Sequence, residues 1–266
     1  MGLTETLAGL TGPILAALDP FCGPAGIFRW LAGGTLMACG DDGWGDEVGA
    51  GFLVTLTLAV ATLPVGLMLG FFIALAKQSE AATLRLAANI YTTIFRGLPE
   101  LLTIFMIYFG LQIGIRQLVA ALGFETSFEI NTFFAGMIAL ALVFSAYASE
   151  VLTSAFKAIP KGQYEAGNAL GLRGGKTMRF IILPQLVRIA LPGLGNLWMI
   201  LIKDTALISV IGLGDILRQT GIAARVTKEA FMFYGLACLM FLALAIVSSW
   251  GFSWLEQRSR RSEAAR

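Results

Sequence analysis

The sequence contains no histidine and few charged residues. Charged side chains make up 14% of its 266 residues, against about 25% in an ordinary soluble domain, whereas apolar residues make up 57%. Without imidazole the chain cannot form a Ser-His-Asp or Cys-His catalytic group, a histidine-ligated zinc site or a histidine proton shuttle. The composition therefore predicts a membrane protein, and we expect neither catalytic residues nor a metal site in it.

Cysteine is also scarce. Cys22, Cys39 and Cys238 are too few for a disulfide framework and too far apart for a Cys-x-x-Cys site. A bridge between Cys22 and Cys39 can form if that stretch faces an oxidising compartment, but we favour unpaired thiols.

The net charge of +2 excludes the strongly basic footprint of a nucleic-acid-binding protein.

Long uncharged runs predict how often the chain crosses a membrane. A bilayer core about 30 Å thick is crossed by roughly 20 apolar residues in a helix, because every backbone amide must be satisfied within its own segment. Residues 51–76, 130–149 and 230–255 contain no charged residue and are each predicted to cross. Residues 86–115 and 180–202 are apolar but interrupted, and we expect them to cross as well. The predicted fold class is an all-α membrane protein with five transmembrane helices.

The interruptions predict where helices break or bend. The segment Arg96-Gly97-Leu98-Pro99-Glu100 places two charges and a proline in the second crossing, so one helix should end near residue 95 and another begin near residue 99. In the fourth crossing, Pro184 and Pro192 predict kinks. Residues 205–214 are too short to cross, and we expect a re-entrant or surface segment.

Two glycine pairs have the spacing of a close helix contact. Gly66 with Gly70, and Gly110 with Gly114, both fit Gly-x-x-x-Gly, which lets a second helix approach. Such pairs also arise by chance in a chain with 31 glycines. We favour chance for each pair, and neither pair identifies a function.

Basic residues favour one orientation in the membrane. With the amino terminus outside, the inner segments hold eleven lysine and arginine residues and the outer segments five, which is typical of a cytoplasmic inner side. Residues 1–48 then form an acidic periplasmic extension without a signal peptide, with a short interfacial helix around residues 26–37. Residues 49–256 form the transmembrane domain, and residues 257–266 form a basic cytoplasmic tail.

One long polar segment separates the third and fourth crossings. Residues 153–179 carry five basic residues and a single acid, Glu165, on the predicted cytoplasmic side. Pro160 should stop the preceding helix, because proline clashes with the turn before it. Residues 162–170 then predict a short helix on the membrane surface, with Gly171 in the left-handed conformation after its end.

The same segment resembles the EAA loop of ABC-importer permeases, which reads Glu-Ala-Ala, three residues, Gly, nine residues, Ile-x-Leu-Pro. Here Glu165, Ala166 and Gly171 keep this spacing to the later run Ile181-Ile182-Leu183-Pro184. The departure is Gly167 in place of the second alanine, which weakens local helicity slightly and preserves the spacing.

The resemblance extends over residues 51–255 and narrows to one branch of the family. Arg96-Gly97-Leu98-Pro99-Glu100, Ile107-Tyr108-Phe109-Gly110 and Lys203-Asp204-Thr205-Ala206-Leu207 are similar to permeases that import histidine, arginine, ornithine and opines. This resemblance implies a type I importer bundle with a cytoplasmic coupling helix. It also implies a complex with a second homologous permease, two ATPase subunits and a periplasmic binding protein. A heterodimer of permeases is favoured, with a homodimer as the alternative.

In such a permease the EAA loop, here residues 153–184, docks in a cleft of the ATPase. The residues expected to couple to the ATPase are Glu165, Ala166, Gly167, Gly171 and Arg173. Ile181, Leu183 and Pro184 complete the motif as structural residues. A short helix held between two crossings by Pro160 and Pro184 cannot move independently of them, so pushing it should rotate both. The alternative is a solvated loop attracted to anionic lipid.

Charged residues within the crossings are candidates for the translocation path, because such charges are costly in a membrane. The candidates are Arg96, Glu100, Glu150 and Asp204. Some of the acids would meet a cationic or zwitterionic substrate. The alternative, which we favour, is that Arg96 and Lys203 pair with these acids and hold the bundle together.

The resulting hypothesis is a permease subunit in a bacterial inner membrane that translocates polar, mainly basic, amino acids or opines and performs no covalent chemistry. Gly174-Gly175-Lys176-Thr177 lacks the earlier glycine and the preceding strand of a P-loop. ATP and magnesium are therefore expected on the partner ATPase, and this chain is expected to need no cofactor. The alternatives are a self-sufficient ion-coupled secondary transporter or channel, and a membrane scaffold that transports nothing.

Overall fold

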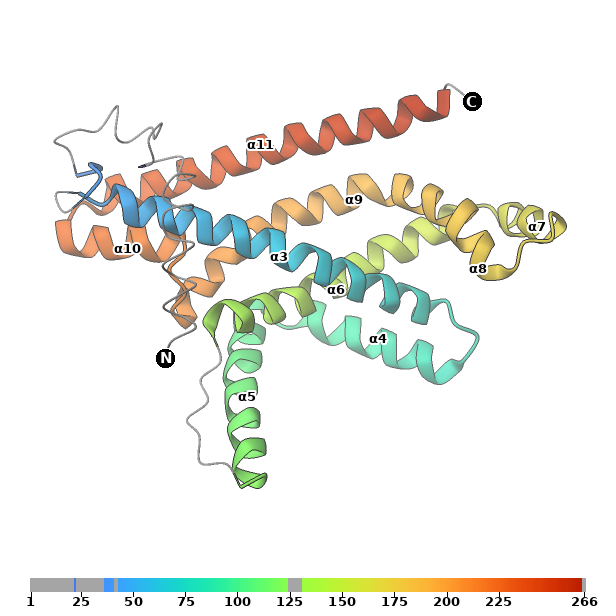
Figure 1. The fold of residues 1–266 in the computed structure, drawn as a ribbon, viewed down its shortest axis with the longest axis horizontal. Coiled ribbons are helices and arrows are strands. Elements are labelled where there is room, and N and C mark those ends of the chain that lie inside the picture. The colour runs from blue at the N-terminus through green and yellow to red at the C-terminus, as the bar shows by residue number, and fades with distance from the viewer. Residues whose placement is uncertain (1–21, 23–35, 41–42, 124–130, 265–266) are drawn as a thin grey trace. The chain divides into compact units, whose positions relative to one another are not determined.

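The computed structural model describes residues 22, 36–40, 43–123 and 131–264, and every regular element within them is a helix (Figure 1). The predicted all-helical fold is confirmed for this part of the chain. The helices are α3 Gly45–Lys77, α4 Ala82–Gly97, α5 Glu100–Ala121, α6 Thr132–Ala158, α7 Lys161–Ala169, α8 Gly174–Thr177, the π-helix η1 Met178–Ile182, α9 Leu183–Asp204, the 3-10 helix η2 Thr205–Ile211, α10 Ile216–Thr227 and α11 Ala230–Ala264.

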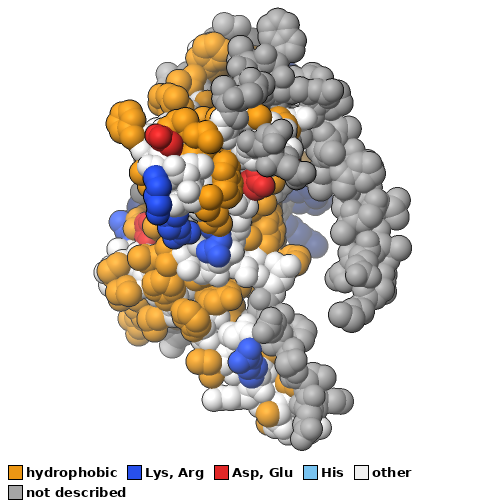
Figure 2. Space-filling view, turned by 90° about the vertical axis from the view of Figure 1, so that its left-hand side faces the viewer, with side chains coloured by type: hydrophobic (Ala, Val, Ile, Leu, Met, Phe, Trp, Pro, Cys, Tyr) orange, Lys and Arg blue, Asp and Glu red, His pale blue; other side chains and the backbone are white. Residues whose placement is uncertain are grey.

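Five helical segments are long and apolar enough to cross a bilayer, as the sequence predicts. They are Gly45–Lys77, Glu100–Ala121, Thr132–Ala158, Gly174–Ile211 and Ala230–Arg258. On the face drawn in Figure 2, hydrophobic side chains cover much of the part that is not grey, with some charged ones among them, and large hydrophobic side chains are exposed along most of the helices. This surface is suited to contact with lipid.

The second crossing differs from the predicted range 86–115. Its apolar helix is α5, and α4 is a separate, shorter helix. Leu98 is extended, with φ −90° and ψ 145°, because the following Pro99 disfavours a helical conformation. The chain bends sharply there, and α5 leaves at a steep angle to α4 (Figure 1). The predicted break between residues 95 and 99 is confirmed.

The fourth crossing is continuous from α8 through η1 and α9 to η2. Residues 205–211 extend α9 instead of forming a separate re-entrant or surface segment. The Thr205 hydroxyl donates to the Ile202 carbonyl at 2.6 Å, which supports the tighter last turns. Gly212, with φ +105°, then ends the helix in a conformation that glycine adopts without strain.

The chain divides into two compact units, residues 1–58 with 208–242, and residues 59–207 with 243–266. In the second unit α6 is central and contacts α4, α5 and α9. The first glycine pair lies in this unit. A methyl group at Gly66 would lie 2.6 Å from Phe144 Cδ1, and one at Gly70 would lie 2.9 Å from Ala148 Cβ. That pair therefore does mark a close helix contact, contrary to our preference for chance.

The second pair, Gly110 and Gly114, shows the opposite result. A methyl group at either position would have no neighbour within 4 Å. The identical spacing of the two pairs could not distinguish them, because the partner helix decides whether the groove is filled.

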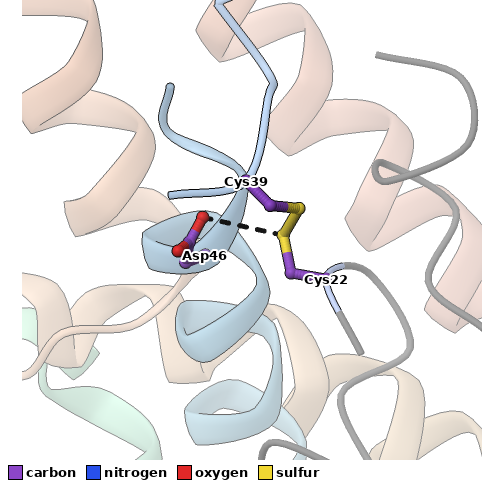
Figure 3. A group of neighbouring side chains, drawn as sticks. All are labelled: Cys22, Cys39 and Asp46. Atoms are coloured by element: carbon purple, nitrogen blue, oxygen red, sulfur yellow. Dashed lines mark hydrogen bonds between the residues drawn. A yellow bond between two sulfur atoms is a disulfide. The ribbon is translucent and has the colours of Figure 1, made fainter. Parts of the chain in front are cut away.

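In the first unit the loop before α3 is held by a disulfide and by Asp46 (Figure 3). Cys22 and Cys39 are joined, so the preference for unpaired thiols is wrong for these two residues, whereas Cys238 is free and exposed. The Asp46 carboxylate accepts from the Gly40 amide at 2.8 and 2.9 Å and lies 3.7 Å from Cys22 Sγ. The joined sulfurs cannot act as thiolate ligands, so this group of three is no metal site.

The helix expected around residues 26–37 falls almost wholly outside the described residues.

Candidate functional site

The EAA segment folds as the sequence predicts. The helix α6 ends at Ala158, Pro160 caps the next helix, and α7 spans Lys161–Ala169. The Gly171 amide donates to the Asn168 carbonyl at 2.9 Å, and the Leu172 amide donates to the Gly167 carbonyl at 3.1 Å. With Gly171 at φ +71°, this pair of bonds is a Schellman ending, which satisfies carbonyls that the helix leaves open.

The helix α7 has a covered face and an open face. Gly167 is buried, and Gln163 and Tyr164 are half-buried. Tyr164 packs against the core cluster that contains Ile182, and burial raises the pKa of its hydroxyl. On the open face Glu165 and Ala166 are exposed, and the side chain of Leu170 is 76% exposed. Such an arrangement leaves one face of α7 free for a partner while the other is fixed to the bundle.

Gly167 lies where no larger residue fits. A methyl group at this position would lie 2.5 Å from Thr177 Cγ2 and 2.8 Å from Thr177 Oγ1, both on α8. Thr177 is itself buried. Glycine in place of the second EAA alanine therefore permits a close contact between α7 and α8, and this compensates for its lower helix propensity.

The remaining motif residues connect this loop to the fourth crossing. Arg173 caps α8, and its carbonyl accepts from the Lys176 amide at 2.7 Å, while its side chain is exposed. Ile181 lies in the π-helix η1, and Leu183 and Pro184 begin α9. The sequence motif thus marks the whole path from α7 to α9.

Two of the charged path candidates join a third residue in an ion-pair cluster within the second unit. Lys77 Nζ lies 2.6 Å from Glu150 Oε1, and Arg96 Nη1 lies 3.0 Å from the same oxygen. The Lys77 side chain is only 7% exposed. Glu150 and Arg96 therefore connect α3, α4 and α6, which is the pairing of base with acid that the sequence analysis favoured for Arg96.

The other two candidates, Glu100 and Asp204, lie together at a small cavity. Both carboxyl groups line this cavity and are close enough to interact electrostatically. The walls of the cavity are mainly apolar side chains from α5, α6 and α9. Its lining is Glu100, Ile104, Leu140, Val143, Phe144, Tyr147, Leu197, Ile200, Leu201 and Asp204. Two adjacent carboxylates repel each other when both are charged, so the pair is complementary to a cationic group.

Sequence reasoning missed Tyr147. It lines the same cavity, and the Arg96 guanidinium lies 5.7 Å from the centre of its ring. Tyr147 therefore connects the ion-pair cluster to the carboxylate pair. Its spacing from Leu140, Val143 and Phe144 places all four residues on one face of α6, and that helical periodicity is the signal that could have found it.

Comparison with known proteins covers most of the chain. Residues 66–261 match the family of binding-protein-dependent transport system inner membrane components. The chain is 41% identical over 228 residues to the nopaline transport system permease protein NocQ of Agrobacterium fabrum, covering 85% of this chain and 97% of that protein. It is 38% identical over 223 residues to the arginine ABC transporter permease protein ArtQ of Escherichia coli, covering 79% and 93%.

A solved structure supports the same assignment. The crystal structure of an amino acid ABC transporter with histidines includes a chain that is 32% identical, with a TM-score of 0.68, covering 81% of this chain and 95% of that one. The fold, the EAA segment and the sequence relatives agree. The chain belongs to the binding-protein-dependent transport system inner membrane component family, and it is a multi-pass membrane permease subunit of an ABC importer.

Proposed function

We propose that this permease translocates basic amino acids or opines, driven by ATP hydrolysis on a partner subunit. The relatives named for nopaline and arginine support this substrate class. The observation that carries the proposal is the pair of Glu100 and Asp204 at one cavity, because a guanidinium or ammonium group between them would relieve their repulsion.

The walls of the cavity favour the same kind of substrate. Apolar side chains exclude water and strengthen the attraction between a carboxylate and a cation. They also suit the aliphatic stem of an arginine-like molecule. Transport requires that the substrate leave again, and a change in the packing of α5, α6 and α9 around the cavity would separate the two carboxylates and release it.

The ATPase partner would dock on the open face of α7. Glu165 and Arg173 offer charges there, and Ala166 and the exposed Leu170 offer apolar contact. Gly167 and Gly171 shape this helix and its ending. ATP and magnesium would bind to the ATPase, whose closure pushes α7 and, through η1, the fourth crossing.

The complete importer would contain two permeases, two ATPase subunits and a periplasmic binding protein. We place a homologous second permease beside this chain as a heterodimer, as the Arg96 to Glu100 segment favours. Membrane lipid covers the remaining apolar surface. The ion-coupled alternative finds no support, because the matched family consists of binding-protein-dependent systems.

The amino terminus would be periplasmic and the carboxyl terminus cytoplasmic. The excess of basic residues on the inner segments supports this orientation. The disulfide between Cys22 and Cys39 adds independent support, because disulfides persist in the oxidising periplasm and not in the cytosol.

Reconstitution tests the proposal directly. The chain is purified with its second permease and ATPase, placed in proteoliposomes and given its binding protein, ATP and labelled arginine, ornithine, nopaline or glutamate. We expect ATP-dependent uptake of the cationic compounds and no uptake of glutamate. The permease alone should take up none of them. Uptake by the permease alone, driven by an ion gradient, would show that the proposal is wrong.

A further inference from the structure

The junction between the coupling loop and the fourth crossing is built differently from an ordinary helix. The π-helix Met178–Ile182 leads directly into Pro184. Proline has no amide hydrogen, and a π-turn widens the helix, so this junction has a weaker backbone ladder than the helix on either side. Without further support, α7 could move here without moving α9.

One side chain bridges this junction. The Gln185 amide nitrogen donates to the Ile181 carbonyl at 2.9 Å and lies 3.1 Å from Gln163 Oε1 on α7, to which it also donates. A single amide group therefore joins the π-turn, the start of α9 and the coupling helix. Both glutamines are half-buried, so water competes less for these bonds than on an open surface.

The bridge lies on the covered face of α7, next to two apolar contacts. Tyr164 packs against the cluster that contains Ile182, and Gly167 contacts Thr177. Those contacts fix α7 to α8 and to the core, whereas the bond from Gln163 to Gln185 joins α7 directly to α9. It is thus the described polar contact best placed to carry a displacement of α7 into the fourth crossing.

We propose that Gln185 is a positioning residue that, through Gln163, makes the fourth crossing move with the coupling helix. This inference rests on the proposed function, because it assigns the transmission of ATP-driven motion to a particular pair of side chains. The path then continues along α9 to Asp204, which lies at the carboxylate cavity. A substitution that removes the bridge should leave nucleotide hydrolysis intact and reduce transport per ATP.

The experiment measures uptake and ATP hydrolysis in the same proteoliposomes containing the complete importer. Gln185→Leu and Gln163→Leu each keep the side-chain size and remove the bond. We expect each to lower the amount of substrate transported per ATP by about two- to thirty-fold. The double variant should be no worse than either single one, because both lose the same bond. Gln163→Glu keeps an acceptor oxygen and should retain normal coupling.

Gln78→Leu is the matched control. Gln78 directly follows α3, and its amide donates to the Ala74 carbonyl four residues earlier at 3.1 Å, as that of Gln185 does to Ile181. The control should transport normally. The inference is overturned if the leucine variants assemble and transport the normal amount of substrate per ATP, or if the effects of the two substitutions add. It is also overturned if the variants no longer bind the ATPase, because the bridge would then support the fold alone. A wild-type importer without ATP-dependent uptake would instead contradict the proposed function.

Discussion

Gly167 on α7 and Thr177 on α8 pack so closely that the added methyl group of an alanine would lie 2.5 Å from Thr177 Cγ2. Gly167→Ala should therefore separate α7 from α8, even though alanine is the better helix former. Overpacking of a buried contact costs about 1–3 kcal/mol. We expect lower thermal stability in detergent and weaker retention of the ATPase during co-purification.

Thr177→Ala in the same chain is the compensating change, because it removes both side-chain atoms that the methyl group would meet. The double variant should regain most of the lost stability. If Gly167→Ala is as stable as the wild type, the contact is not as tight as described.

Glu165→Lys should leave the protein inserted and abolish ATP-driven uptake. The side chain is exposed on the open face of α7, so the fold does not depend on it. Reversing its charge would place a cation where the ATPase meets a carboxylate. Uptake and ATP hydrolysis are measured in proteoliposomes. Glu80→Lys, at another exposed position on the predicted cytoplasmic side, is the control and should transport normally. Normal uptake by Glu165→Lys would show that this residue does not take part in docking the ATPase.

Asp204→Asn and Glu100→Gln should each reduce uptake of a cationic substrate by about ten- to a hundred-fold, with unchanged insertion. Each variant replaces one of the two carboxyl groups that line the cavity with an amide. The uptake rate is measured over a range of binding-protein concentrations, so that delivery of substrate does not limit it. An unchanged rate for both variants would place the substrate elsewhere.

Breaking the cluster around Glu150 should affect stability more than substrate choice. Glu150→Gln leaves the nearly buried Lys77 ammonium without its charged partner. The cost is about 1–3 kcal/mol, because Glu150 itself is 36% exposed and partly screened. Thermal unfolding in detergent measures it. Lys77→Met with Glu150→Met should be more stable than Glu150→Gln, because no unpaired buried charge remains. We expect the wild type, Glu150→Gln and the double methionine variant to take up different amino acids in the same proportions.

Asp215 should make stability fall as pH rises. It caps α10, its Oδ1 accepts from the Arg218 amide at 2.9 Å, and its buried Oδ2 has no hydrogen-bond partner among the described residues. Burial raises the pKa of this carboxyl from 3.8 to about 6, although backbone hydrogen bonds, first that from the Arg218 amide, oppose the shift. The folded protein thus binds this proton more tightly than the unfolded chain does. The stability that the bound proton gives the fold is lost as the pH rises from about 4 to about 6.

Asp215→Asn tests this sign, since asparagine is also a good helix cap. The variant should be more stable than the wild type at pH 8 by about 1–3 kcal/mol, and the difference should shrink at pH 4. Thermal unfolding at both pH values gives the comparison. A variant that is less stable at pH 8 would show that the charged form is favoured in the fold.

The sequence was a good guide wherever one residue imposes a local constraint. Pro160 and Gly171 delimit α7, and Pro99 separates α4 from α5, because the backbone of each residue restricts its neighbours. The EAA spacing likewise marked the loop, since its residues follow one another along a short stretch of chain.

Contacts between distant segments could not be predicted in this way. Nothing in the sequence distinguished Gly66 and Gly70 from Gly110 and Gly114, and only the approach of Phe144 and Ala148 separates them. The four charged path residues looked alike as well. The cluster at Glu150 depends on how α3 and α4 pack against α6, and the cavity at Asp204 depends on how α5 and α9 pack against the same helix.

The bond between Cys22 and Cys39 also bears on how the protein is made. Both cysteines precede the first crossing, which begins at Gly45. If this end of the chain is exported, an oxidase can join them while the remaining helices are still being inserted. The disulfide then reports that the amino terminus was exported. Chains whose amino terminus stays in the cytosol keep two thiols, which a maleimide reagent can label after denaturation.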